Sequence, residues 1–155
     1  MVATSGDRLL DADAETTLAR ELLPLAALVT PNLHEARILT GLEVETLDDM
    51  RAAARALVER GAGAALVKGG HLEGDAVDLL WDGTDERVWR KPRLDTRHTH
   101  GTGCTLSAAV TAGLANGLAL ADATDRAVRW VAKAIETAPG LGSGHGPVNH
   151  FFPSD

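Results

Sequence analysis

The sequence predicts a single α/β domain whose sheet is mainly parallel and carries one hairpin, and three observations lead to this fold class. Segments with apolar residues at helical spacing alternate with short apolar runs along the chain. The run Ala64–Lys68 is apolar up to its terminal lysine and precedes two glycines, as expected of a buried parallel strand that ends at the ligand-binding edge of a sheet. The segments 75–81 and 87–91 flank the turn sequence Asp82–Asp85 and predict an antiparallel hairpin.

The helices are predicted from apolar spacing together with residues that cap or stop a helix. They cover residues 11–23, which Pro24 stops; 33–40, which Asn32 caps; a segment opened by Thr46; a small-residue segment from Gly101-Thr102-Gly103-Cys104 to Asn116-Gly117; and 123–137, which Asp122 caps. In the first helix, the apolar face consists of Leu18, Ala19, Leu22 and Leu23. Ala26–Thr30, which lies between two prolines, is predicted as a buried strand.

Composition and charge limit the partners that the chain can have. A chain of 155 residues with 45% hydrophobic content can bury one sizeable core. The net charge of -7, without a local basic patch, argues against nucleic acid as a partner. Every apolar stretch is broken well short of a membrane span, so no membrane partner is expected. A single cysteine, and no charged leader followed by an apolar run, predict a cytoplasmic protein.

The stretch around the only cysteine is the strongest candidate for a ligand site. Gly101 and Gly103 allow the backbone to bend closely around a ligand, so that the amides of residues 102–105 could converge on an anion at a helix N-terminus. The same amides would favour the thiolate form of Cys104, which could then act as a base. The alternative is ordinary turn chemistry beside a small buried cysteine.

Three other sets of residues have two interpretations from the sequence alone. Asn32 and Glu35 have the spacing of a capping box, which would be a purely structural role. Lys68 is either a phosphate contact or a solvated strand end. Four histidines, His98, His100, His145 and His150, have no zinc-site spacing, so they are interpreted as hydrogen-bonding residues of loops.

Five ordered segments resemble one enzyme family, the hydroxymethylpyrimidine/phosphomethylpyrimidine kinases of thiamin biosynthesis, which belong to the ribokinase-like superfamily. The segments are Ser5-Gly6, Thr30–Ala36, Val67–His71, Thr99–Ala109 and Gly144–Phe151. Because the five matches keep their order over nearly the whole chain, they are far more specific together than any one of them.

The resemblance implies a three-layer α/β/α fold of the ribokinase-like type. Residues 1–155 are then expected to form the C-terminal portion of a single kinase domain that lacks the N-terminal part of the fold. The implied activity is phosphorylation of hydroxymethylpyrimidine and of its monophosphate with ATP and Mg²⁺, inactive or impaired in this fragment. The alternatives are a non-catalytic truncated nucleotide-binding fragment, or a related kinase of pyridoxine or pyridoxal. Expected partners are a small pyrimidine alcohol and either further copies of the chain or a missing N-terminal portion.

The resemblance also implies a role for each candidate residue. Cys104 stands where most ribokinase relatives have a catalytic aspartate, and it would act as the base. Gly101, Thr102 and Gly103 would form the anion hole, and Lys68, Asn32 and Thr102 would bind the nucleotide. Glu35 and Asn32 would organise magnesium and its waters.

Overall fold

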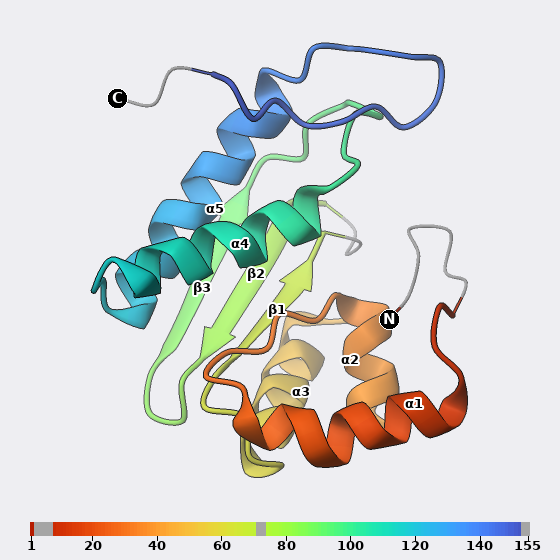
Figure 1. Ribbon diagram of the computed structural model, residues 1–155, viewed down its shortest axis with the longest axis vertical. Helices are drawn as coiled ribbons and strands as arrows, with labels where there is room; N and C mark the ends of the chain where they lie inside the picture. The colour runs from red at the N-terminus through yellow and green to blue at the C-terminus, as the bar shows by residue number, and fades with distance from the viewer. Residues whose placement is uncertain (2–7, 71–73, 153–155) are drawn as a thin grey trace. The chain divides into compact units, whose positions relative to one another are not determined.

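The computed structural model describes residues 1, 8–70 and 74–152 (Figure 1). The segment Ser5-Gly6, and His71 at the end of the segment Val67–His71, lie outside the described residues. The chain divides into two compact units, Met1–Arg93 and Leu94–Asp155, and each is described by itself.

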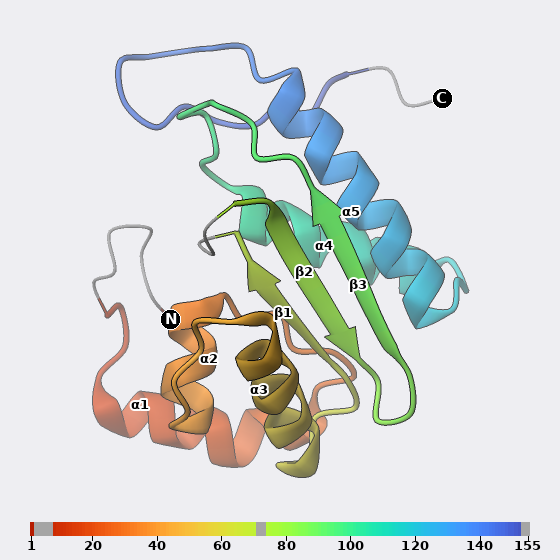
Figure 2. The same cartoon turned by 180° about the vertical axis from the view of Figure 1, so that it is seen from behind.

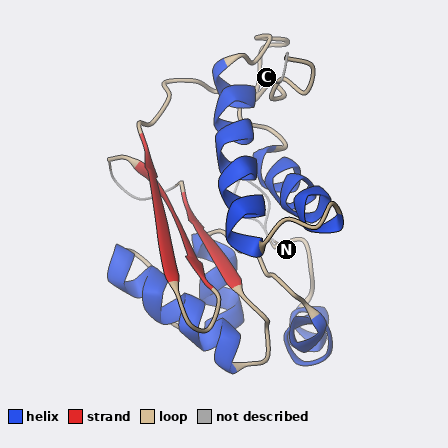
Figure 3. Cartoon of the chain, turned by 90° about the vertical axis from the view of Figure 1, so that its left-hand side faces the viewer, coloured by secondary structure: helices blue, strands red, loops and turns tan. Residues whose placement is uncertain are grey.

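The first unit contains three strands and most of the helical turns. Its elements are α1 (Ala12–Thr17), η1 (Leu18–Leu22), η2 (Leu23–Leu25), α2 (Leu33–Thr40), α3 (Leu47–Glu59), β1 (Ala65–Gly69), β2 (Ala76–Trp81) and β3 (Glu86–Lys91). The second unit contains α4 (Thr102–Ala115) and α5 (Leu120–Glu136). A helix is therefore present in each region where one is predicted, although α5 begins three residues early, because Asp122 lies in its first turn and does not cap it (Figure 3).

The three named strands pair antiparallel in the order β1-β2-β3. The predicted hairpin of β2 and β3 is confirmed. The prediction of a mainly parallel sheet is wrong for the named strands. Residues 70–75 alone connect β1 to β2, whereas a crossover between parallel strands needs a dozen or more residues.

Parallel pairing is present beside β1, but only as two isolated bridges. Val29 pairs with Ala65, and Asn32 pairs with Lys68. Between them, the carbonyl of Pro31 accepts from the Lys68 amide at 2.8 Å. Pro31 itself has no amide to return, so the ladder is interrupted and 26–30 does not become the predicted strand.

The core of the first unit lies between the sheet and the helices, where α3 packs against β1 and β2 (Figure 2). One face of α3 and the facing strand residues are almost completely buried, namely Met50, Ala53, Ala54, Leu57, Val67 and Leu79. Gly69 is required at the end of β1, because an added Cβ would come within 2.4 Å of the Val77 carbonyl oxygen and 3.0 Å of Met50.

The helical segment before α2 departs from the predicted apolar face at one residue. Leu23 is 1% exposed, as predicted, whereas Leu22 is 58% exposed. The π-helical turn η1 and the tighter turn η2 interrupt the α-helical period here, so residues that would share a face in a regular helix separate.

The second unit is a pair of helices joined by a short connection, residues 116–119. Gly113 of α4 packs directly on Ala123 of α5, and an added Cβ would lie 2.8 Å from the Ala123 Cβ. The absence of a side chain at Gly113 therefore allows the two helices to approach closely there. Ala108 and Ala112, in contrast, are exposed on α4.

Candidate functional site

The start of α4 is open, as a helix start that binds a ligand would be. Its N-cap, Gly101, has φ +87° and contributes no side-chain cap. The Thr102 amide donates to the Thr99 carbonyl (3.2 Å), and the Thr105 amide donates to the Gly101 carbonyl (2.9 Å). Among the described residues, no acceptor is found for the amides of Gly103 and Cys104. Of the four amides at residues 102–105 that were predicted to bind an anion, two adjacent ones, those of Gly103 and Cys104, are available to do so in the described structure.

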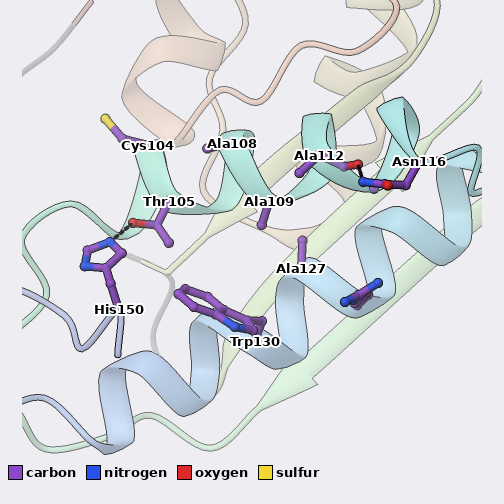
Figure 4. Close-up of a pocket in the computed structure, with 11 residues that line it drawn as sticks. Cys104, Thr105, Ala108, Ala109, Ala112, Asn116, Ala127, Trp130 and His150 are labelled. Atoms are coloured by element: carbon purple, nitrogen blue, oxygen red, sulfur yellow. Dashed lines mark hydrogen bonds between the residues drawn. The ribbon is translucent and has the colours of Figure 1, made fainter. Parts of the chain in front are cut away.

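Cys104, which carries the second of these amides, is exposed. A groove of about 550 Å³ begins beside it and continues between α4 and α5, with Trp130 and Ala127 on the α5 side. Figure 4 shows Thr105 and His150 facing each other, while the sulfur of Cys104 projects away from them. The interpretation of Cys104 as a buried packing residue is therefore wrong.

The C-terminal segment holds the first turn of α4 in place. His100 donates its amide to the Gly146 carbonyl (3.1 Å) and accepts from the Val148 amide (3.4 Å). The His150 Nε2 lies 3.0 Å from the Thr105 hydroxyl oxygen (Figure 4). His150 and also His145, whose Nδ1 lies 3.2 Å from the Arg97 carbonyl oxygen, are thus the loop hydrogen-bonding residues that were predicted.

The start of α2 is closed by its own side chains. The Asn32 Oδ1 accepts from the Glu35 amide (2.8 Å), and the Glu35 Oε2 accepts from the Asn32 amide (2.9 Å). This is the predicted capping box, and it satisfies two helix-start amides reciprocally. The other oxygen of Glu35, Oε1, lies 3.4 Å from the Met1 amino group.

Lys68 lies beside this helix start, because its backbone pairs with that of Asn32. Asn32, Glu35 and Lys68, which were predicted separately, therefore form one group in the first unit. Gly101, Thr102, Gly103 and Cys104 form the other group, in the second unit. Within the described part of the chain, the Lys68 side chain has no hydrogen bond or ion pair.

Asn32, Glu35 and Lys68 fit a magnesium ion that is held through its waters. No group of three or more histidine, cysteine, aspartate or glutamate side chains that could hold a metal ion is found among the described residues. One Glu35 oxygen already accepts a hydrogen bond from the Asn32 amide. Such a carboxylate fits contact with the waters of Mg²⁺, which usually keeps several of them, better than direct coordination.

Sequence reasoning missed two features next to Lys68. Asp78 of β2 is 6% exposed, and its Oδ2 lies 2.7 Å from the Nζ of Lys91. Arg93 donates to the carbonyls of Gly70 (2.8 Å) and Gly74 (3.1 Å), so it ties together the two ends of the loop that follows Lys68. The signal for the first feature was available, because a charged residue inside the apolar run 76–81 requires a partner.

No helix in the described part of the chain is both long enough and apolar enough to cross a membrane.

Comparison with known proteins is consistent with the ordered motifs. The family model for phosphomethylpyrimidine kinase matches residues 1–149. The hydroxymethylpyrimidine/phosphomethylpyrimidine kinase of Streptomyces coelicolor is 50% identical over 149 residues, which are 96% of this chain and 55% of that protein. The chain thus spans about half the length of this curated relative.

Solved structures agree on the fold. The ADP complex of Bacillus subtilis pyridoxal kinase aligns with a TM-score of 0.87 at 39% identity, over 92% of this chain and 56% of that one. The phosphomethylpyrimidine kinase of Clostridium difficile aligns with a TM-score of 0.76 at 35% identity, over 87% of this chain and 54% of that one. The structure is therefore part of a ribokinase-like α/β fold, and the chain belongs to the phosphomethylpyrimidine kinase family.

Proposed function

We propose that this chain is the C-terminal portion of a kinase that transfers the γ-phosphoryl group of ATP to hydroxymethylpyrimidine, and then to its monophosphate, in thiamin biosynthesis. The observation that carries the proposal is the open start of α4, where the adjacent amides of Gly103 and Cys104 have no acceptor among the described residues and Cys104 is exposed. Charge builds up on the transferring phosphoryl group, and fixed amides beside the base can stabilise it.

The second unit supplies the chemistry at the acceptor. In the first transfer, Cys104 would take the proton of the substrate hydroxymethyl group as the hydroxyl oxygen attacks the γ-phosphorus, and the bond from that phosphorus to the bridging oxygen would break to release ADP. The amides of Gly103 and Cys104 would donate to the phosphoryl oxygens, and Gly101 provides the left-handed backbone that begins this turn. The Thr102 hydroxyl donates to the Thr99 carbonyl at 2.6 Å, so Thr102 contributes by shaping the turn.

The first unit supplies the groups for the nucleotide. Lys68 would contact its phosphates, and Asn32, whose backbone pairs with Lys68, lies close enough to assist. Magnesium, when bound, would neutralise phosphate charge, and Glu35 with Asn32 would hold its waters. Structures of related pyridoxal kinases in complex with ADP and with AMP-PCP support the use of ATP.

The 155 residues alone are expected to bind nucleotide weakly and to be inactive or impaired as a kinase. The relatives use about twice this length, and losing the orientation of a substrate can remove much of the roughly 7–11 kcal/mol that positioning provides. Activity should appear when the chain is mixed with the part of the Streptomyces coelicolor kinase that it does not cover. No phosphorylation by this mixture, with a correctly folded chain, would contradict the proposal.

Two alternatives are decided by the same experiment. The similarity to pyridoxal kinase structures favours pyridoxal as a second acceptor, so the mixture is assayed with each alcohol in competition. Greater kcat/KM for pyridoxal would reassign the substrate. Magnesium-dependent ADP binding by calorimetry, without turnover on either alcohol, would instead indicate a non-catalytic nucleotide-binding fragment.

We further propose that the protein acts in the cytoplasm and associates, either with further copies or with an N-terminal portion. Exposed leucines before α2 support association, because Leu25 is 81% exposed and Leu22 is 58% exposed. Light scattering should then give a mass above that of one chain, or a mass that rises on addition of the partner portion.

A further inference from the structure

A buried carboxylate lies directly opposite the candidate phosphate lysine. Lys68 of β1 and Asp78 of β2 are partners in the antiparallel register. Directly opposite residues of such a pair have Cβ atoms about 4.5–5.5 Å apart, which a lysine side chain can span. Asp78 is only 6% exposed, so its charge requires a partner in place of water.

The carboxylate nevertheless pairs with a different lysine. The Nζ of Lys91, on β3, lies 2.7 Å from the Asp78 Oδ2. The side chain of Lys68 has no ion pair with any residue that the structure describes. The lysine on β3 thus pairs with the buried carboxylate, whereas the lysine directly opposite it on β1 does not.

We propose that Lys91 is a positioning residue that keeps Lys68 available for the nucleotide phosphates by neutralising Asp78. This inference rests on the proposed phosphate role of Lys68. A buried carboxylate left without Lys91 would be strongly unfavourable. Its nearest remedy is the opposite lysine, whose cross-strand position allows the same pairing. A lysine that is held by Asp78 no longer meets a phosphate with a free ammonium group.

The geometry assigns different effects to each partner. Removing Lys91 should weaken nucleotide binding because Lys68 turns to Asp78. Removing the charge of Asp78 should leave binding unchanged or slightly tighter, because neither lysine is then held. Removing both should restore binding, and this rescue distinguishes competition for Asp78 from a general loss of positive charge.

The test is calorimetry of Mg·ADP on the 155-residue chain, with thermal unfolding to verify that each variant is folded. Lys91→Met should raise the Kd about 10-fold, the effect of losing one hydrogen bond to a charged group, and Lys91→Arg should stay within about twofold. Asp78→Asn combined with Lys91→Met should return the Kd to the parent value. Arg90→Met is the matched control, since it removes a positive charge from an exposed residue of the same strand, next to Lys91 in sequence. A 10-fold loss in the control, or no rescue in the double variant, would overturn the inference.

A readout without nucleotide separates this inference from the proposed function. NMR of the lysine ammonium groups should show a hydrogen bond from Lys68 to Asp78 in Lys91→Met, and none in the parent chain. If Lys68→Ala leaves Mg·ADP binding unchanged, the phosphate role of Lys68 is wrong, and the NMR experiment alone decides the pairing. If Lys68→Ala weakens binding but Lys91→Met neither weakens it nor shifts the Lys68 signal, the function stands and the role of Lys91 is wrong.

Discussion

The starts of α2 and α4 both contain residues predicted to bind the phosphates or their metal. They differ in whether their backbone amides already have hydrogen-bond acceptors. At α2, Asn32 and Glu35 close the helix start with a reciprocal pair of hydrogen bonds. At α4, Gly101 contributes no side chain, and the Gly103 and Cys104 amides have no acceptor among the described residues. A closed start stabilises the fold without a ligand, whereas an open one leaves donors for an anion.

The start of α3 is also closed, and it shows that hydrogen-bond donors at a helix start favour a negative charge. At α3, the hydroxyl of Thr46 and the amides of Glu45 and Thr46 donate to Asp49 and hold the pKa of this carboxyl below its ordinary value. The α4 start offers amide donors of the same kind without a resident carboxylate. The difference between the starts therefore predicts that an external anion binds at α4 and not at α2 or α3.

The largest expected effect is at the open start, in the base. Cys104→Ala should lower kcat of the complemented kinase by about 10²–10⁴-fold, because it removes the group that takes the proton. Nucleotide affinity should stay nearly unchanged, since the base acts only in the transition state. Steady-state kinetics and Mg·ADP calorimetry measure the two quantities. Near-normal turnover would show that the open start does not contain the base.

The next effect tests the backbone that opens the start. Gly101→Ala should destabilise the chain by about 1–3 kcal/mol, because a residue with a Cβ is strained at φ +87°. The strain is conformational, since the nearest atom to the added Cβ, the Thr105 hydroxyl oxygen, is 4.0 Å away. Denaturant unfolding gives the free energy, and Gly70→Ala, at a position without positive φ or close neighbours, is the matched control. Equal losses at the two positions would contradict this account.

At the closed start, the structural and functional roles of one residue can be separated. Glu35→Gln keeps a side chain that can complete the capping box but removes the charge that magnesium waters would need. We expect stability within about 0.5 kcal/mol of the parent, together with several-fold weaker Mg-dependent ADP binding. Asn32→Ala should instead cost about 1 kcal/mol of unfolding free energy by removing the cap. Unchanged Mg-dependent binding in Glu35→Gln would leave Glu35 a purely structural residue.

Local signals in the sequence predicted the features that depend on neighbouring residues. The capping box of Asn32 and Glu35, the hairpin and the glycine at the α4 start all follow from residue types a few positions apart. The pairing of β1 was predicted wrongly because an apolar run does not specify the direction of its partner. The connection 70–75 indicates the direction, because it is too short for a crossover between parallel strands.

The parts of the site that depend on distant residues could not be predicted in this way. The bond between Thr105 and His150 joins residues 45 positions apart, and no periodicity relates them. The sequence also did not indicate that the Thr102 and Thr105 amides donate hydrogen bonds to backbone carbonyls. These bonds depend on the path of residues 99–101 and not on residue type. The identity of the candidate residues was therefore accessible from the sequence, but the number of donors they leave free was not.

The smallest expected effect comes from the turn between β2 and β3, where an aspartate already fills a cluster of backbone amides. The amides of Asp85 and Thr84 donate to the Asp82 Oδ1 at 2.7 and 2.9 Å, and these bonds hold the pKa of Asp82 below its ordinary value. A carboxyl whose pKa is lower in the folded chain stabilises the fold above its unfolded pKa of about 3.9. That stability is lost as the pH falls through the folded value.

Asp82→Asn keeps an oxygen that accepts from both amides but removes the titration. Unfolding measured between pH 7 and pH 2 should therefore show a shallower loss of stability below about pH 4 in the variant than in the parent. The difference at neutral pH should stay under about 1 kcal/mol, because the turn is exposed and solvent screens the charge. Parallel pH profiles would mean that two backbone amides do not measurably favour an anion in this chain, and an anion would then not be expected at the equally small amide pair of Gly103 and Cys104.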